Sequence, residues 1–392
     1  MTELEDRRPS RVTTVSEPLS SPAGPPEPRP WRRAGVMPWG LLAALVAAVM
    51  LLTSPVADQQ AAAPGRVPPA VAWPRAQSAT LPGFLPDGPL YQPVYFLDPR
   101  VSVGIAATAA GDEQRLLLRG ADGAIRVLRR MPYAQSPQFT GFTTTSGGDV
   151  VVVWAESRSE RSARLWAADL RTGARARLLT ADTGNAVFTG SQYDLVVAAG
   201  RVYWAAGTET ADPATEIRSV ALTGGPVDVR VEPGSWSLTA WPWLVNGLSE
   251  QLPSSRLRNL RSGIEVEVAA SPTELATCSP AWCRILIGST DGLARIDLMQ
   301  PNGTGRRRIA GGAASSPITD VAPLDRFEIL AEPEVDTDAT GAQRLLVYDL
   351  ATGRTVDLGA GVTGADYRGG VLWWSTGGDD HTQWHTIDLR TV

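Results

Sequence analysis

The chain has 392 residues, of which 43% are hydrophobic and 20% are charged, as is typical of a large globular protein. The formal net charge is −5, and all the basic residues are arginine. Because nucleic acid is bound by a concentrated basic surface, this charge argues against a nucleic-acid partner. The lack of lysine in the sequence excludes every mechanism that needs a lysine side chain.

The chain begins with a polar segment and then an apolar one. Residues 1–33 are rich in proline, serine and charged residues, which predicts a disordered cytoplasmic tail. Residues 34–57 contain no charged side chain and are long enough to cross a lipid bilayer as a transmembrane helix. Arginines precede this segment and Asp58 follows it, so the rule that positive residues stay inside predicts a cytoplasmic N-terminus and an extracytoplasmic main domain.

A cleaved signal peptide is the alternative to this single-pass anchor, because the strictly apolar centre, 41–52, has the length of a signal h-region. We favour a retained anchor in the cell membrane, since the leader is long for a signal peptide and no good cleavage site follows it. Residues 58–80 are rich in alanine and proline, which predicts a semi-extended linker.

Short alternating segments separated by turns fill the chain from residue 81 onward. Three of them are related: Leu165–Gly173, Leu346–Gly353 and Trp384–Thr391 each contain Asp-Leu-x-Thr at the end of a strand-like run. A strand that recurs with further strands between its copies is typical of β-propeller blades. We therefore predict an all-β fold over residues 81–392, a β-propeller with seven blades as the best count and six or eight as alternatives.

The end of the chain is expected to complete the ring. The last unit, Ala365–Val392, shows only three clear strands. Propellers commonly pair the two ends of the chain within one blade, which removes exposed sheet edges. We therefore predict that a strand within Leu81–Leu97 completes the final blade.

The two cysteines of the sequence, Cys278 and Cys283, bracket a four-residue turn between two strand-like runs. Across a hairpin the two thiols can face each other, and outside the cytoplasm they are expected to oxidise. We predict a structural disulfide. The spacing is not Cys-x-x-Cys, which argues against redox catalysis, and two thiols are too few for a zinc site.

Aromatic residues are expected to fill the space between blades. Six tryptophans lie within predicted strands: Trp154, Trp166, Trp204, Trp373, Trp374 and Trp384. Three others, Trp236, Trp241 and Trp243, lie beside glycine and proline near a loop and can alternatively form a platform for a sugar. We favour core packing for these three as well.

Two acidic segments are candidates for cation binding. Asp379, Asp380 and His381 precede the strand that holds His385, and four residues of strand span ~13 Å, too far for the two histidines to share an ion. The segment 336–341 begins like a calcium loop, but Val347 stands where the closing glutamate is required. We favour polar turns at both places, and we predict no cofactor.

Motifs for enzymatic activity are missing from the sequence. It contains no Gly-x-Ser-x-Gly elbow, no phosphate-binding loop with lysine and no His-Glu-x-x-His pair. Carboxylate chemistry at the mouth of the central channel, as in propeller glycosidases, is still compatible with the sequence. Asp291 and Asp379 are candidates for such a role, with no order between them.

From about Leu81 to Val392 the chain resembles the TolB-like and WD-repeat-like propellers of bacterial envelopes, in particular anchored forms in actinobacteria. The resemblance rests on the three related phrases and on the Cys278–Cys283 hairpin. The chain differs from TolB in having a predicted anchor and no separate N-terminal α/β domain. The resemblance implies a scaffold that presents its loops and channel mouth to a protein or glycan.

We therefore predict a membrane-anchored, extracytoplasmic and non-catalytic binding module of the cell envelope. Its expected partners are the lipid bilayer and an envelope protein or a glycan. The alternative is a glycan-active or other hydrolytic enzyme that uses carboxylates at the channel mouth.

Overall fold

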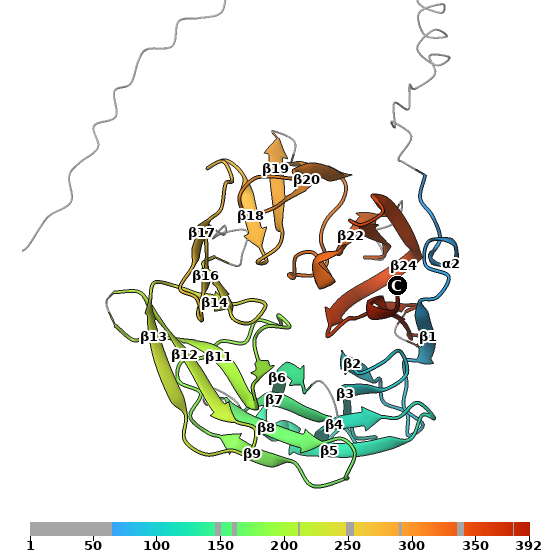
Figure 1. The fold of residues 1–392 in the computed structure, drawn as a ribbon. Helices are drawn as coiled ribbons and strands as arrows, with labels where there is room; N and C mark the ends of the chain where they lie inside the picture. The colour runs from blue at the N-terminus through green and yellow to red at the C-terminus, as the bar shows by residue number, and fades with distance from the viewer. Residues whose placement is uncertain are drawn as a thin grey trace, which may run out of the picture. The chain divides into compact units, whose positions relative to one another are not determined.

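The protein is an all-β propeller in which six antiparallel sheets surround a common centre (Figure 1). The computed structural model describes residues 65–145, 150–158, 163–210, 212–247, 255–289, 292–334, 341–378 and 380–392. Helical structure within these residues is limited to the short helix α2 (Pro69–Ala72) and three single turns, η1 (Tyr133–Gln135), η2 (Pro323–Asp325) and η3 (Leu389–Thr391).

Sheets 1 to 3 each contain four strands that follow one another in the chain. Sheet 1 consists of β2 (Gln92–Phe96), β3 (Ser102–Ala107), β4 (Glu113–Arg119) and β5 (Ile125–Pro132). Sheet 2 consists of β6 (Pro137–Thr144), β7 (Val151–Arg158), β8 (Arg164–Asp169) and β9 (Arg177–Thr180). Sheet 3 consists of β10 (Val196–Ala198), β11 (Arg201–Gly207), β12 (Ala214–Ala221) and β13 (Asp228–Pro233).

Sheets 4 and 5 repeat this order, and sheet 6 is larger. Sheet 4 consists of β14 (Ser237–Leu238), β15 (Trp243–Val245), β16 (Arg256–Asn259) and β17 (Glu265–Glu267). Sheet 5 consists of β18 (Leu275–Cys278), β19 (Cys283–Ser289), β20 (Gly292–Met299) and β21 (Arg307–Gly311). Sheet 6 consists of β22 (Phe327–Pro333), β23 (Gln343–Asp349), β24 (Arg354–Arg368), β25 (Val371–Thr376), β26 (Gln383–Asp388) and β1 (Gln77–Pro82).

The best count from the sequence, seven blades, is corrected to six, which was one of the two alternatives. The sequence divides near Gly359 and Gly361, two residues that commonly mark a turn. In the structure both have positive φ, yet β24 continues through them, and its pairing register shifts there as in a β-bulge. The first half of β24 pairs with β23 and the second half with β25, so the last two expected units form one six-stranded sheet.

The predicted pairing of the chain ends is present, with a different strand. β1 pairs antiparallel with β26 from Gln77 opposite Asp388 to Pro82 opposite Gln383. Only Leu81 and Pro82 fall within the range predicted for this strand, and the rest of that range leads into β2 of sheet 1. Alternation of polar and apolar residues over 78–81 is the strand signal that the alanine and proline content of the preceding residues concealed.

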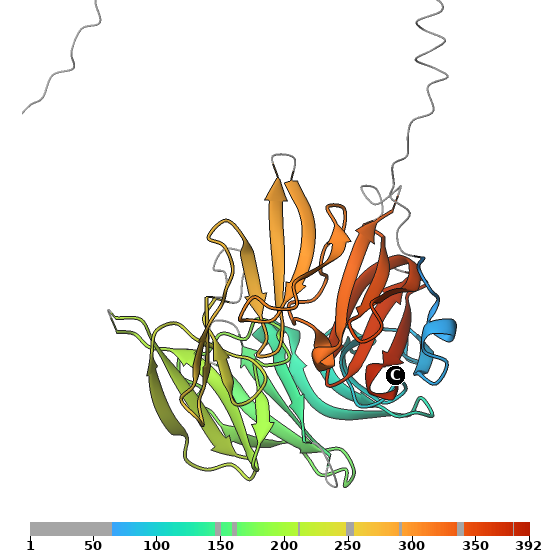
Figure 2. The ribbon, with the colours of Figure 1, turned by 45° about the horizontal axis from the view of Figure 1, so that its top comes forward.

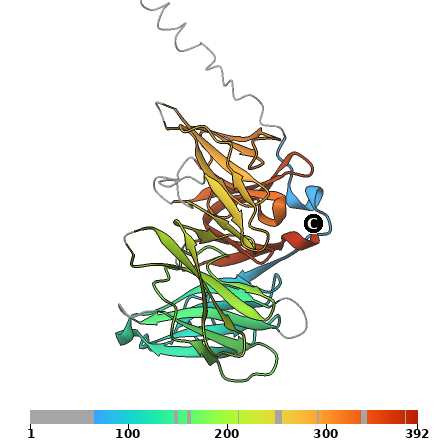
Figure 3. The same ribbon diagram turned by 60° about the vertical axis from the view of Figure 1, so that its left-hand side comes forward.

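The segment before β1 packs on sheet 6 instead of standing apart from it. Val67 pairs with Val356, and the Trp73 ring meets Phe327 edge to face with 5.5 Å between ring centroids. In all three views α2 lies beside the C-terminus (Figures 1, 2 and 3). The predicted tail, the predicted membrane span at 34–57 and residues 58–64 lie outside the described residues. Within the described residues no helix has the length and apolar character to cross a membrane.

The hydrophobic core lies between neighbouring sheets, where side chains from facing strands interlock. Strands alternate buried and less buried residues, and the largest fully buried side chains include three of the tryptophans predicted within strands, Trp154, Trp204 and Trp373. Trp154 packs between sheets 1 and 2, and Trp373 contacts Phe96 across the seam where sheet 6 meets sheet 1. The expectation that aromatic residues fill these seams is therefore confirmed.

Candidate active site

Polar and titratable side chains meet where the connections between sheets reach the centre of the ring. The connection from β9 to β10 carries Ser191 and Asp194, and the connection from β21 to β22 carries Asp320. The Ser191 hydroxyl donates to Oδ1 of Asp320 at 3.2 Å. Two segments that are far apart in the chain are thereby joined.

Arg368, at the end of β24, ties these connections to the rest of the ring. It is only 5% exposed. Its Nη2 donates to the carbonyl oxygen of Gly190 at 2.5 Å, and its Nη1 lies 3.4 Å from the carbonyl oxygens of Phe142 and Ser191. Phe142 belongs to β6 of sheet 2, which is not a neighbour of sheet 6 around the ring, so this guanidinium crosses the centre.

Three carboxyl groups surround this guanidinium and are affected by burial. The pKa of Asp320 is raised to about 6, chiefly by burial and to a smaller extent by the charge of Asp366, while Arg368, the Ser191 hydrogen bond and Arg284 lower it. Burial also raises the pKa of Asp194 and of Asp366, while Arg368 lowers both. A carboxyl group with a pKa near 6 can both donate and accept a proton close to neutral pH, as general acid–base catalysis requires.

A pocket of about 300 Å³ opens beside Asp320. It is lined by residues from the two connections, from β11 of sheet 3 and from β14 of sheet 4: Val187, Thr189, Ser191, Tyr193, Asp194, Ala205, Ser237, Leu238 and Thr319. Hydroxyl groups dominate its polar wall, and Asp194 is the charged residue among these described lining residues. Asp320 is not one of these described lining residues, but its carboxyl group is bonded by the Ser191 hydroxyl of the pocket wall, and it follows Thr319 in the chain.

Tyr193 supplies a hydroxyl group to the same wall. Burial, together with the negative charges of Asp320 and Asp325, raises the pKa of this hydroxyl, so Tyr193 keeps its proton and can act as a donor. A second, smaller pocket of about 160 Å³ is also lined by Tyr193, together with residues of the first strands of sheets 1, 2 and 3. Tyr193 therefore contributes to the walls of both pockets.

The turn that follows Asp320 has a strained backbone. Ala322, Leu324 and Asp325 have φ angles of 46°, 56° and 55°, a left-handed conformation that residues other than glycine seldom adopt. Such conformations persist only where the surrounding structure holds them, and they concentrate at functional sites. The connection from β21 to β22 is therefore held in a specific shape next to the pocket.

The candidates chosen from the sequence that fall within the described residues do not line this pocket. Asp291, Asp379 and the acidic residues 336 and 338 fall outside the described residues, so their proposed roles stay predictions. His385 is in β26, where its ring stacks on Trp374 and bonds the hydroxyls of Thr80 and Thr376. Among the described residues, no group of three or more histidine, cysteine, aspartate and glutamate side chains is arranged to hold a metal ion.

The three tryptophans considered as a sugar platform are separated by packing. Trp236 is 6% exposed and donates from Nε1 to the carbonyl oxygen of Pro233, while Trp241 packs against Tyr203 with 3.9 Å between ring centroids. Trp243 is half-buried against the core between sheets 4 and 5. Core packing, the favoured interpretation, is what the structure shows for these residues.

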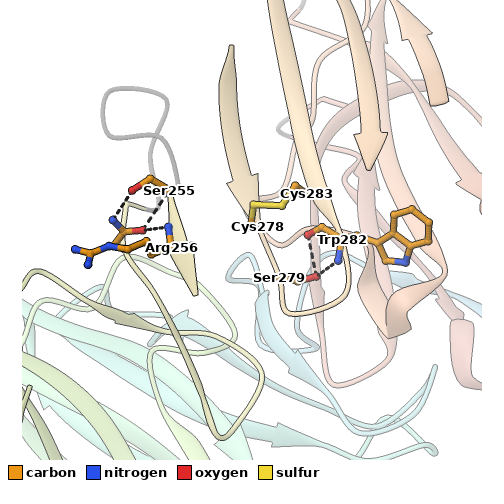
Figure 4. The surroundings of a disulfide bond; sticks show 7 residues. Ser255, Arg256, Cys278, Ser279, Trp282 and Cys283 are labelled. Carbon is orange, nitrogen blue, oxygen red and sulfur yellow. Dashed lines mark hydrogen bonds between the residues drawn. A yellow bond between two sulfur atoms is a disulfide. The ribbon is translucent and has the colours of Figure 1, made fainter. Parts of the chain in front are cut away.

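The predicted disulfide between Cys278 and Cys283 is present and joins β18 to β19 at a directly paired position (Figure 4). Both cysteines are buried in the core between sheets 4 and 5. Ser279 shapes the turn, because its hydroxyl accepts from the Trp282 amide and lies 3.1 Å from the Trp282 carbonyl oxygen. Neither cysteine is among the described residues that line the pocket.

The central residues were missed because no local motif contains them. Asp366 and Arg368 lie in a segment that the sequence identified only as a short strand, and Asp320 lies in the connection between two predicted units. The available signal was the length of the connections before β10 and β22, since connections that carry function are often long. Which residues they bring together depends on the closure of the ring.

Known protein families and curated proteins give no match to this chain. Several solved structures match it. The chain is similar to a puromycin-hydrolyzing peptidase from Mycobacterium tuberculosis, at 16% identity and a TM-score of 0.50, over 80% of this chain and 55% of that one. It also matches the β-propeller domain of the Trilobed protease from Pyrococcus furiosus, at 11% identity and a TM-score of 0.44, over 74% and 89% of the two chains.

A third structure, an oligogalacturonate lyase in complex with manganese, matches at 10% identity and a TM-score of 0.41, over 80% of this chain and 98% of that one. The chain thus spans about half the length of the peptidase, and at these identities the likeness shows the propeller fold alone. The expectation of a non-catalytic protein is nevertheless corrected, because the structure with a TM-score of 0.50 is that of a hydrolysing enzyme.

Proposed function

We propose that the propeller is a hydrolytic enzyme that uses carboxyl groups at the centre of the ring. The observation that carries this proposal is Asp320, whose pKa of about 6 accompanies a position beside a hydroxyl-lined pocket. Perturbed carboxyl groups next to a pocket are a common property of active sites. The likeness to the peptidase supports the fold, and the carboxyl groups support the reaction class.

In the proposed reaction, protonated Asp320 donates a proton to the leaving group as the bond to it breaks. Asp194, on the pocket wall, accepts hydrogen bonds from the Gly190 amide at 2.7 Å and the Thr189 hydroxyl at 3.2 Å. These two donors favour its ionised form, whereas burial has the larger effect and raises its pKa. A carboxylate with a raised pKa is the stronger base, so Asp194 is suited to take a proton from the attacking water. Two carboxyl groups in different environments can thus divide the acid and base roles.

The lining of the pocket favours an uncharged or cationic substrate with several hydroxyl or amide groups, such as a glycan. Thr189, Ser191 and Ser237 can exchange hydrogen bonds with such groups, and Tyr193 can donate one. An anionic substrate would face the Asp194 carboxylate, whose like charge opposes binding. Apolar contacts from Val187 and Leu238 complete the wall.

We further propose that the enzyme works outside the cytoplasm, held at the cell envelope by the segment 34–57. The Cys278–Cys283 bond supports this, because structural disulfides form and persist in oxidising compartments. The TolB-like resemblance supports an envelope location as well. A fusion of a reporter to the C-terminus, assayed for surface exposure in intact cells, tests the topology.

The catalytic proposal is tested with the purified chain on panels of fluorogenic glycosides, oligosaccharides and peptides. We expect turnover of a glycan-type substrate, lowered about 100-fold or more in Asp320→Asn with the fold intact by circular dichroism. Asp228→Asn, an exposed carboxylate on β13, is the matched control and should keep full activity. Binding of a substrate without its cleavage, or full activity in Asp320→Asn, would refute the proposal.

A further inference from the structure

We propose that Arg284 and Glu328 form a clamp that positions Asp320, so that Arg284 is a positioning residue for the proposed acid. Arg284 lies on β19 of sheet 5, and Glu328 lies on β22 of sheet 6. The role of Asp320 in this inference rests on the proposed function. The clamp itself is defined by contacts that do not depend on any reaction.

Arg284 contacts the backbone on the N-terminal side of the strained turn. Its Nη1 lies 3.3 Å from the carbonyl oxygen of Ile318 and 3.4 Å from that of Thr319. Its Nη2 donates to the carbonyl oxygen of Asp320 at 2.7 Å. One guanidinium therefore contacts three successive carbonyl groups of the connection between β21 and β22, and the last of them belongs to Asp320.

Glu328 completes the clamp from the other side. Its Oε1 accepts from Nε of Arg284, and its Oε2 accepts from the Ala322 amide at 2.8 Å. The side chain of Glu328 has no exposure to solvent, and that of Arg284 has 6%. The two residues thus fix the backbone both before and after Val321, which leaves the Asp320 side chain directed to the Ser191 hydroxyl.

A buried ion pair is a poor device for stability alone, because desolvation of two charges offsets much of their attraction. Apolar residues of similar volume would join sheets 5 and 6 as well, but they would remove the Arg284 donors from the carbonyl groups of Thr319 and Asp320, whereas the Ile318 carbonyl also accepts from the Ser316 hydroxyl. The pair between Arg129 and Glu156 provides a contrast. That guanidinium bonds Glu156 through Nε and Nη2 and joins β5 to β7, with no contact to the connections at the centre.

The clamp also acts on Asp320 through its charge. The positive charge of Arg284 lowers the pKa of Asp320, in opposition to burial and to the charge of Asp366. Loss of this charge should therefore move the Asp320 titration to higher pH. Loss of the backbone contacts with retention of the charge should instead loosen the turn and leave the titration closer to that of the parent.

The test compares Arg284→Lys and Arg284→Met with Arg129→Lys and Arg129→Met in the full chain. The readouts are the titration of the Asp320 carboxyl by ¹³C NMR, assigned by its absence in Asp320→Asn, and amide hydrogen exchange of residues 318–322. We expect faster exchange in both Arg284 variants. In Arg284→Met we also expect an Asp320 pKa that is higher by about half a unit or more. A kcat about 10-fold lower should accompany the loosened turn.

If Arg284→Met does not fold, the exchange rates of Arg284→Lys decide the question. Exchange of 318–322 and an Asp320 titration that change no more than in the Arg129 variants would overturn the clamp. Failure of the proposed function is recognised separately, because full activity in Asp320→Asn would remove the catalytic role and leave the NMR and exchange results unaffected.

Discussion

The seams between the sheets and the centre of the ring are built from opposite kinds of side chain. At the seams, fully buried tryptophan, leucine and valine residues interlock, as Trp154 and Trp373 do. At the centre, Asp320 and Asp366 are half-buried and Arg368 is buried. Asp320 accepts from the Ser191 hydroxyl, Asp366 accepts from the Tyr367 amide, and Arg368 donates to backbone carbonyl oxygens. Burial of apolar surface stabilises a fold, whereas burial of ionisable groups costs stability. The comparison indicates that the apolar seams stabilise the fold, whereas the ionisable residues at the centre serve the proposed function.

The largest effect is expected from a cavity in a seam. Trp154→Ala removes a side chain with no exposure between sheets 1 and 2, which should lower the free energy of unfolding by about 4 kcal/mol. Denaturant titration followed by circular dichroism measures this. Loss of the proposed catalytic activity at temperatures where the variant is still folded would contradict the separation of roles between the seams and the centre.

At the centre, a substitution is expected to increase the free energy of unfolding, by an amount that depends on pH. The pKa of Asp320 is about 6 in the folded chain and about 3.9 when unfolded, so the folded state binds more protons between these values. The stability that this group contributes is fully present below about pH 4 and is lost as the pH rises through 6. Asp320→Asn cannot ionise, so relative to the parent it should gain up to about 3 kcal/mol between pH 4 and pH 7.

Thermal and denaturant unfolding across this pH range measure that gain. The control is Asp228→Asn, whose carboxylate lies on an exposed strand and should give a difference from the parent that does not vary in the same way. If the free energy of unfolding varied with pH in the same way in the parent and in Asp320→Asn, the ionised Asp320 would not destabilise the fold.

The seams and the centre also differ in how well the sequence predicted them. Trp154 was placed correctly because it lies in a continuous apolar run whose two faces pack in neighbouring seams, and Trp204 because its strand alternates buried and less buried residues. Asp194, Asp320 and Arg368 meet only after the ring has closed, and their spacing in the chain follows no repeat. The number of blades was missed for a related reason, since a bulge at Gly359 and Gly361 carries β24 past an expected boundary.

A smaller effect is expected from the disulfide, which lies in the seam between sheets 4 and 5. Joint replacement of Cys278 and Cys283 by serine should lower the free energy of unfolding by about 2 kcal/mol, because the closed loop is short. Unfolding of the parent in the presence and absence of a reductant provides the same comparison without mutation. Activity should persist in both, as the bond is not part of the central site.

The smallest effect is expected at the outer edge of the ring. Arg66 pairs with Glu332 at 2.5 Å, and the two side chains are 32% and 28% exposed. Exposed pairs of this kind contribute little in water, so Arg66→Ala should change stability by about 0.5 kcal/mol and leave activity unaltered. A loss comparable to that of the disulfide would show that the segment before β1 contributes more to closure than its contacts indicate.

Closure by β1 places both ends of the ring on one sheet, with the Gln77 amide 2.9 Å from the Thr391 hydroxyl. Ring closure is therefore held by backbone hydrogen bonds and has no covalent link at this point. A circular permutant that joins Val392 to Gln77 through a short peptide and opens the β4–β5 turn near Gly123 would keep every sheet and make that closure covalent. The order of the strands along the chain can thus be changed while the central carboxyl groups keep their positions.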